Sequence, residues 1–137
     1  MRFTIPSDFS AARDVQKRIL RSLATRGFNS QSTFAVKLAL EEAIINAIKH
    51  GNKLDPAKTV IIEAKITPTQ AQISVQDQGS GFDRRHVPDP TLEENLQKCN
   101  GRGIFLIEAY MNKAKWTKGG RRITMIRKNQ LDEVPKK

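Results

Sequence analysis

The chain has 137 residues, a formal net charge of +10, 38% hydrophobic residues and 28% charged residues, which is the balance of a soluble globular protein with one core. No apolar run approaches the ~20 residues needed to span a membrane, and the polar N-terminus, interrupted by Pro6, is unlike a signal peptide. The only cysteine, Cys99, excludes an intrachain disulfide and a cysteine zinc site. We therefore expect a cytoplasmic protein with no membrane contact.

The first predicted elements are a strand and a helix. Alternation from Arg2 to Ile5 predicts a strand that Pro6 ends, and Ser7 or Asp8 can cap the next element. That element is a helix over about residues 10–26, because apolar residues recur at helical spacing and Gly27 stops the run. Basic residues form a stripe on another side of this helix, which is either a solvated face or a surface for an acidic partner: Arg13, Lys17 and Arg21.

A second helix is predicted after Phe28, capped by Ser30 or Ser32 and stopped by Gly51-Asn52. At 100° per residue one side collects Phe34, Leu38, Ile45 and Ile48, and a different strip collects Ala35, Ala39, Glu42, Asn46 and Lys49. Glu42 and Asn46 are four residues apart and project together, whereas Glu41 lies far round the helix. The Glu42–Asn46 pair is either part of a site or an exposed polar pair.

The rest of the chain predicts mostly strands. Residues 59–67 and 71–76 are strand-like and joined so tightly that they must be antiparallel. Residues 83–100 lack periodicity and are expected to be mobile, with one helical turn near 92–97. A helix over 104–111 and an antiparallel pair, 114–117 and 122–127, follow. This order predicts an α+β two-layer sandwich with a mixed, mostly antiparallel sheet and three helices on one face. Residues 1–128 form a single domain and 129–137 a polar tail.

Two glycine-containing stretches carry candidate binding chemistry. Asp77-Gln78-Gly79-Ser80-Gly81 follows a strand, where a carboxylate can accept a hydrogen bond from the exocyclic amine of adenine and glycines let the backbone approach a flat ring. Turns use the same residues, so a simple loop is the alternative. Gly101-Arg102-Gly103 opens a helix, whose free N–H groups favour an anion such as phosphate, although these glycines also suit a plain turn into the helix.

Three motifs follow one another along the chain: Glu42-x-x-x-Asn46 on a helix, Asp77-x-Gly79-x-Gly81 after a strand, and Gly101-Arg102-Gly103 at a helix start. This order resembles the ATP-binding fold of the GHKL superfamily. The resemblance covers roughly residues 5–128. Within the superfamily the chain is most similar to the anti-sigma-factor serine/threonine-protein kinases of bacterial partner-switching systems. It has no histidine-bearing helical pair, and the segment between Gly81 and Gly101 is short.

This resemblance implies an ATP- and Mg²⁺-dependent kinase. Glu42 is then the general base, Asn46 holds Mg²⁺ through its amide oxygen, and Asp77 reads adenine. The implied nucleotide-binding set is Asn46, Lys49, His50, Asp77, Gly79, Gly81, Arg102 and Gly103. The implied partners are a sigma factor and an anti-anti-sigma antagonist that is phosphorylated on serine, and a homodimer is suggested.

One position departs from the superfamily pattern. Many members place a threonine that helps to bind adenine after the paired glycines of the last hairpin, and here Gly119-Gly120 is followed by Arg121-Arg122, with Thr124 too far along the strand to replace it. Two other functions therefore stay open. One is a non-catalytic ATP-binding sensor module. The other, supported only by the seven basic residues between positions 113 and 128, is a nucleic-acid-binding domain.

Overall fold

The computed structural model of the chain describes residues 1–79 and 101–131, with the side chains of residues 101–103 left out. Five strands form one sheet in the order β1-β2-β3-β5-β4, and each neighbouring pair is antiparallel. The strands are β1 (Arg2–Pro6), β2 (Thr59–Ile66), β3 (Gln70–Gln76), β4 (Lys113–Thr117) and β5 (Arg122–Lys128). The prediction allowed a mixed or an antiparallel sheet, and among the described residues the sheet is entirely antiparallel.

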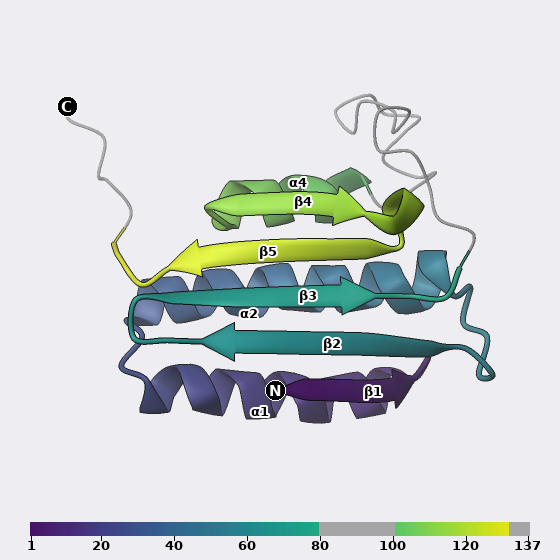
Figure 1. Cartoon of the computed structure of the whole chain (residues 1–137), viewed down its shortest axis with the longest axis horizontal. Helices are drawn as coiled ribbons and strands as arrows, with labels where there is room; N and C mark the ends of the chain where they lie inside the picture. The colour runs from purple at the N-terminus through teal and green to yellow at the C-terminus, as the bar shows by residue number, and fades with distance from the viewer. Residues whose placement is uncertain (80–100, 132–137) are drawn as a thin grey trace.

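The helices all lie on one face of this sheet (Figure 1), which confirms the predicted two-layer α+β architecture. They are α1 (Phe9–Thr25), α2 (Ser30–Ile45) and α4 (Gly101–Tyr110), with a π-helix, η1 (Asn46–Gly51), continuing α2 and a 3-10 turn, η3 (Lys118–Gly120), between β4 and β5. Within the described part of the chain, none of the helices has the length and apolarity to cross a membrane. The segment predicted to be mobile, 83–100, lies outside the described residues.

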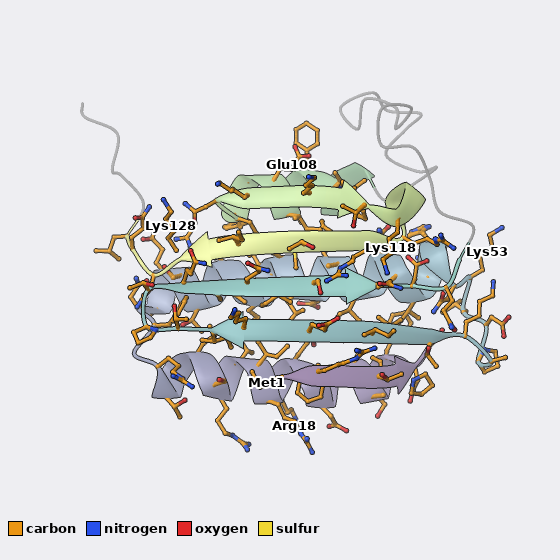
Figure 2. All side chains as sticks on the ribbon, in the orientation of Figure 1. Met1, Arg18, Lys53, Glu108, Lys118 and Lys128 are labelled. Carbon is orange, nitrogen blue, oxygen red and sulfur yellow. The ribbon has the colours of Figure 1, made fainter. Side chains whose placement is uncertain are left out.

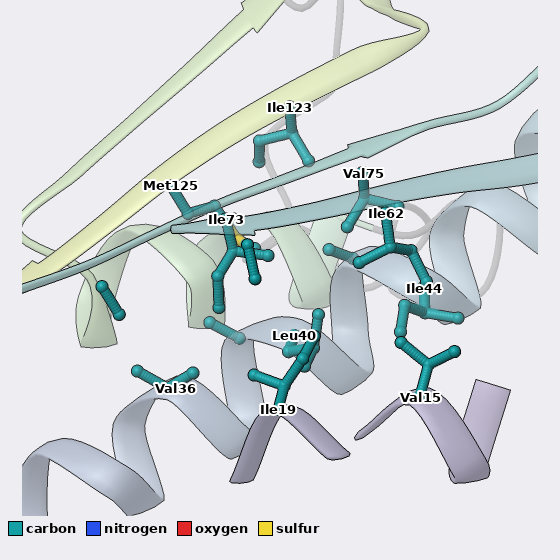
Figure 3. Packing of buried hydrophobic residues seen from close by; sticks show 14 of the residues in the cluster. Val15, Ile19, Val36, Leu40, Ile44, Ile62, Ile73, Val75, Ile123 and Met125 are labelled. Atoms are coloured by element: carbon teal, nitrogen blue, oxygen red, sulfur yellow. The ribbon is translucent and has the colours of Figure 1, made fainter. Parts of the chain in front are cut away.

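The core lies between the sheet and the helices (Figure 3). Alternate residues of the three central strands point into it, as period-two patterning requires, and meet the apolar faces of α1 and α2. The fully buried side chains include Ile19, Leu40, Ile44, Ile62, Ile73, Ile123 and Met125. The other face of the sheet is not covered by any described helix.

The buried face of α2 is not the stripe that the sequence suggests. Phe34 is 52% exposed and Leu38 and Ile45 are only half-buried, whereas Leu40 and Ile44 are almost completely buried. Ile48 is completely buried, as is Ile44 four residues earlier, and it lies within the π-helix that continues α2. The side of the helix that carries these four apolar residues is therefore not the buried face of α2.

The caps of the first two helices are partly as predicted. The Asp8 carboxylate accepts a hydrogen bond from the Ser10 N–H and caps α1, which confirms one of the two predicted caps. The prediction that Ser30 or Ser32 caps α2 was wrong. Asn29 is the cap, and its side chain accepts from the Ser32 N–H at 2.7 Å. Asparagine is a strong N-cap residue, and here the helix begins at Ser30, before either predicted cap would allow.

The end of the sheet at which β5 finishes is held by a polar network. Arg127, only 3% exposed, donates from Nη1 to the Tyr110 carbonyl at the C-terminus of α4 (2.9 Å). The Asn129 side chain accepts from the Asn29 N–H (2.9 Å) and donates to the Pro68 carbonyl (2.9 Å). The hydrogen-bonded structure thus extends past residue 128 into the segment that the sequence analysis assigned to the tail.

These burial values predict how α2 responds to truncation. Leu40→Ala should destabilise the protein by about 2–5 kcal/mol, because it leaves a cavity in a closed core. Phe34→Ala removes a larger side chain, yet it should cost far less because half of that ring is already in water. Urea unfolding monitored by circular dichroism measures both. Equal losses in the two variants would contradict the assigned buried face.

Candidate nucleotide-binding site

Asp77 follows the last residue of β3 and is fixed on both sides. Its N–H donates to the Arg121 carbonyl at 2.9 Å, which extends the pairing of β3 with β5 by one step. Its carboxylate Oδ1 accepts the Gly79 N–H at 2.8 Å, and the side chain is 7% exposed. One oxygen of this buried carboxylate is thus bonded to the Gly79 N–H, and a further hydrogen bond to the carboxylate would require a donor group that fits closely against it.

Two glycines allow the backbone to pack against this carboxylate. A Cβ at Gly51 would overlap the Asp77 carboxylate, and a Cβ at Gly79 would overlap the Gly51 carbonyl. Only residues without a side chain fit at these two positions. The sequence predicted a site role for Gly79 but interpreted Gly51 only as a helix stop, because the contact joins segments that are far apart in the chain.

The end of α2 supplies the second part of the site. Glu42 is half-buried in the last turns of α2, and Asn46, 8% exposed, begins the π-helix and donates its backbone N–H to the Glu42 carbonyl. Short π-helical segments inside helices are frequent at functional sites. Here the π-helix ends at Gly51, so the helix that carries Glu42 and Asn46 leads along the backbone to the residue that contacts Asp77.

Burial changes the proton affinity of both carboxyl groups. Desolvation raises the pKa of Asp77, and the Gly79 N–H and the nearby Arg121 and Lys58 charges oppose that rise. Desolvation, with a smaller contribution from Glu41, also raises the pKa of Glu42. A carboxyl group with a raised pKa is a better proton acceptor, as a general base requires.

Cations surround this end of the molecule. Lys58 and Arg121 act on Asp77, and Lys53 and Lys118 project from the same end of the sheet (Figure 2). Desolvation, followed by the adjacent Lys49, lowers the pKa of His50, which favours the neutral imidazole. The resulting field favours a polyanionic ligand.

The other predicted site residues are distributed as follows. His50 is exposed on the π-helix, next to Gly51. Lys49 lines a separate groove of about 380 Å³ between α1 and α2, together with Arg13 and Glu41. Gly81 lies outside the described residues, and of Arg102 and Gly103 only the backbone is described.

The predicted helix start at Gly101-Arg102-Gly103 can be placed from the backbone. These residues form the first turn of α4, which begins earlier than the predicted residue 104. Figure 1 places the start of α4 at the end of the molecule where β3 finishes. Thr124, by contrast, alternates with the buried Ile123 and Met125 and so lies on the open face of the sheet, away from the helices.

Comparison with known proteins gives the class of this fold and site. The family model of the histidine kinase-like ATPase domain matches residues 5–127, so the chain belongs to that family. An ATPase domain uses ATP, which agrees with the polyanionic ligand that the charges favour.

Two similar proteins carry the names of an anti-sigma factor and a serine-protein kinase. The chain is 36% identical over 80 residues to the anti-sigma F factor of Clostridium perfringens (strain SM101), covering 56% of each chain. It is 29% identical over 103 residues to the serine-protein kinase RsbW of Listeria innocua, covering 70% of this chain and 66% of that protein. The match therefore spans little more than half the length of the first relative.

A solved structure supports the fold. The crystal structure of the RsbU and RsbW domains of a protein from Mycobacterium tuberculosis superposes with a TM-score of 0.60 at 21% sequence identity. The superposition covers 98% of this chain and 33% of that one.

The raised pKa of Asp77 predicts a stability change. A carboxyl group that is harder to ionise in the folded state lowers stability as pH rises from its unfolded pKa through its raised folded pKa. Asp77→Asn should therefore increase the free energy of unfolding at neutral pH, and the gain should vanish in acid below both pKa values. Urea titrations at the two pH values measure it, with exposed Asp14→Asn as the control. A destabilised Asp77→Asn variant at neutral pH would contradict the burial cost.

Proposed function

We propose that this chain is an ATP-dependent serine-protein kinase that also acts as an anti-sigma factor. It binds a sigma factor, and it phosphorylates a serine of the anti-anti-sigma antagonist that competes for the same chain. The observation that carries the proposal is the buried Asp77 carboxylate against Gly51 and Gly79, in a chain of the ATPase-domain family. Residues 1–128 act as one ATP-binding domain in this proposal, and 129–137 as a polar tail whose first residue, Asn129, is hydrogen-bonded to the domain.

The site fits adenine and magnesium by its donor chemistry. The Asp77 oxygens accept hydrogen bonds, as the exocyclic amine of adenine requires, and Gly79 lets the backbone pack closely behind that carboxylate. Gly81, outside the described residues, is retained as a contact on the resemblance alone. The hard amide oxygen of Asn46 suits Mg²⁺, which keeps several waters and phosphate oxygens as its other ligands and needs few protein groups. The described residues hold no group of three or more His, Cys, Asp or Glu side chains that would suggest a different, all-protein metal site.

The phosphate end of the site is assigned to α4. The first turn of that helix has free N–H groups and the positive end of the helix dipole, and Arg102 can add a charge-assisted hydrogen bond to a terminal phosphate. Gly103 lets the phosphates approach the backbone, and the exposed His50 is a further predicted contact. Lys49 was predicted with it, but it lines the groove between α1 and α2 beside Glu41 and is not assigned to the phosphates. Mg²⁺, when bound, neutralises the negative charge of the phosphates.

The reaction assigned to this site is phosphoryl transfer to a hydroxyl group. Glu42 takes the proton of the antagonist's serine as the serine oxygen attacks the terminal phosphorus, and ADP leaves with the bridging oxygen. A half-buried carboxylate with a raised pKa suits this step, since its affinity for the proton is greater than that of an exposed one. The sensor alternative needs Asp77 but does not need Glu42.

The first test is ATP binding. Asp77→Asn replaces a charged acceptor by an amide, and a hydrogen bond to a charged group contributes about 1.5–3 kcal/mol. We expect ATP affinity, measured by calorimetry with Mg²⁺, to fall by about one to two orders of magnitude while the fold stays intact. Unchanged affinity would remove Asp77 from the site.

The second test separates the kinase from a sensor. Glu42→Ala should keep ATP affinity within a few-fold but slow phosphoryl transfer to the antagonist by about 10²–10⁴, the usual contribution of a positioned base. Asn46→Ala should instead weaken the Mg²⁺-dependent binding of ATP. Radiolabel transfer from ATP gives the rate, and the sensor alternative gains support if wild type transfers no label.

Glu41→Ala is the matched control for Glu42. Glu41 is exposed and lines the groove between α1 and α2, so its loss should leave the maximal rate nearly unchanged. Because its charge raises the pKa of Glu42, its removal lowers that pKa. The acid limb of the pH–rate profile should therefore move to lower pH. If Glu41→Ala and Glu42→Ala lose activity equally, the helical phase assigned to Glu42 is wrong.

The basic stripe on α1 is assigned to the protein partner. Arg13 lies at the groove beside α2, and Lys17 is exposed one turn further along α1. The double reversal Arg13→Glu and Lys17→Glu should slow association with the sigma factor more than it speeds dissociation, since long-range charge acts mainly on encounter. ATP affinity should stay unchanged. Surface plasmon resonance at two salt concentrations measures both rates.

The same charge change elsewhere provides the control. Lys113→Glu and Lys115→Glu alter the net charge equally but lie on β4, at the far edge of the sheet. Equal slowing by both pairs would mean that net charge alone drives the encounter. A mobility-shift titration with unrelated duplex DNA tests the nucleic-acid alternative. Tight binding that falls steeply with salt, together with no sigma-factor capture, would replace the anti-sigma proposal.

A further inference from the structure

Asn52 is a completely buried polar residue that follows the π-helix, and its side chain joins three separate segments. Its Nδ2 donates to the Thr59 carbonyl at the start of β2 (2.9 Å) and to Ser7 Oγ after β1 (3.0 Å). Its Oδ1 accepts the Gln78 N–H at the end of β3 (2.8 Å). Each polar atom of the amide has a partner, as burial demands.

These bonds close a ring of three residues. Gln78 donates its N–H to Asn52, Asn52 donates to the Thr59 carbonyl, and the Thr59 N–H donates to Gln78 Oε1 at 2.7 Å. A cyclic arrangement fixes all three residues relative to one another more firmly than separate bonds do. It joins the beginning of β2 to the turn after β3.

The ring holds both segments that meet in the contact between Gly51 and Asp77. Asn52 is bonded in sequence to Gly51, whose backbone packs against the Asp77 carboxylate, and it holds the N–H of Gln78, the residue that follows Asp77. With the Asp77 N–H held by the Arg121 carbonyl, the peptide units on both sides of Asp77 are fixed. Asn52 thus holds the backbone on both sides of the contact between Gly51 and Asp77, while the carboxylate itself accepts the Gly79 N–H.

We propose that Asn52 is a positioning residue that holds Asp77 in the orientation that accepts the exocyclic amine of adenine, and so sets the preference for ATP over GTP. This inference rests on the proposed function. Guanine presents a carbonyl oxygen where adenine presents an amine donor, so it offers the Asp77 carboxylate no hydrogen bond at that position. Discrimination by one buried polar group requires that the group be held in place.

The test compares two asparagines. Asn52→Ala removes the ring, whereas Asn129→Ala removes a similar number of hydrogen bonds at the opposite end of the sheet. Calorimetry with MgATP and MgGTP gives the affinity ratio of wild type and both variants. We expect Asn52→Ala to weaken ATP binding by about tenfold and to change GTP binding by less than about threefold, so that the ratio falls. Asn129→Ala should keep the wild-type ratio.

A milder variant keeps the proposal testable if Asn52→Ala does not fold. Ser7→Ala removes one of the bonds that orient the Asn52 amide, and it should lower the ATP/GTP ratio about two- to threefold without a change in thermal midpoint large enough to unfold the protein. A wild-type ratio in folded Asn52→Ala, or in Ser7→Ala if the first does not fold, overturns the positioning role alone. Wild type that binds neither nucleotide overturns the proposed function and this inference together.

Discussion

The contact between the end of α2 and the end of β3 is the constraint on which the candidate site depends. The Asp77 carboxylate lies against the backbone of Gly51, and Gly79 lies against the Gly51 carbonyl, so that neither glycine can carry a side chain. Withdrawing a carboxylate from water is unfavourable, and the raised pKa of Asp77 expresses that cost. The hydrogen bond from Gly79 and the nearby cations offset only part of it. A hydrogen bond from a polar ligand group would offset the rest of this desolvation cost. A site of this kind lowers the stability of the ligand-free protein and at the same time favours ligand binding.

The sheet and the helical layer together fix the position of this contact. The antiparallel pairing of β3 with β5 brings the Arg121 carbonyl to the Asp77 N–H. The apolar face of α2, with Leu40 and Ile44 in the core, fixes the axis that ends in the π-helix. At the other end of the sheet, Arg127 binds the carbonyl at the C-terminus of α4. The helix whose first turn is assigned to the phosphates is thus anchored from its opposite end, where no ligand is proposed.

The sequence predicted the elements better than the contacts between them. Alternation and helical spacing identify the strands and α1, because a buried face repeats every two or 3.6 residues. Helical spacing places Glu42 and Asn46 on one strip, but Asp77 is favoured as a site residue only through the resemblance of three motifs in order to a known superfamily. The same spacing does not locate the buried face of α2, since Ala43 and Ala47 are buried although they carry little hydrophobic signal, whereas the large Phe34 is half exposed.

The residues that the sequence missed act through tertiary contacts. Asn29 competes with two serines as a cap, and nothing local decides among them. Gly51 and Asn52 look like an ordinary helix stop, yet their partners lie 26 residues further along the chain. The only local signal was the Gly51-Asn52 dipeptide, because a glycine beside an asparagine suits a close contact between two backbone segments as well as it suits a turn.

The two edges of the sheet restrict how copies of this chain can associate. β1 at one edge is five residues long and ends in Pro6, and β4 at the other is equally short and carries Lys113 and Lys115. Short strands with proline or lysine are the features by which sheets avoid pairing with other sheets. A symmetric dimer that continues the sheet from one copy into the next is therefore disfavoured. Of the surfaces that residues 1–79 and 101–131 form, the helical layer and the open side of the sheet are therefore better suited to contact between two copies than the sheet edges are.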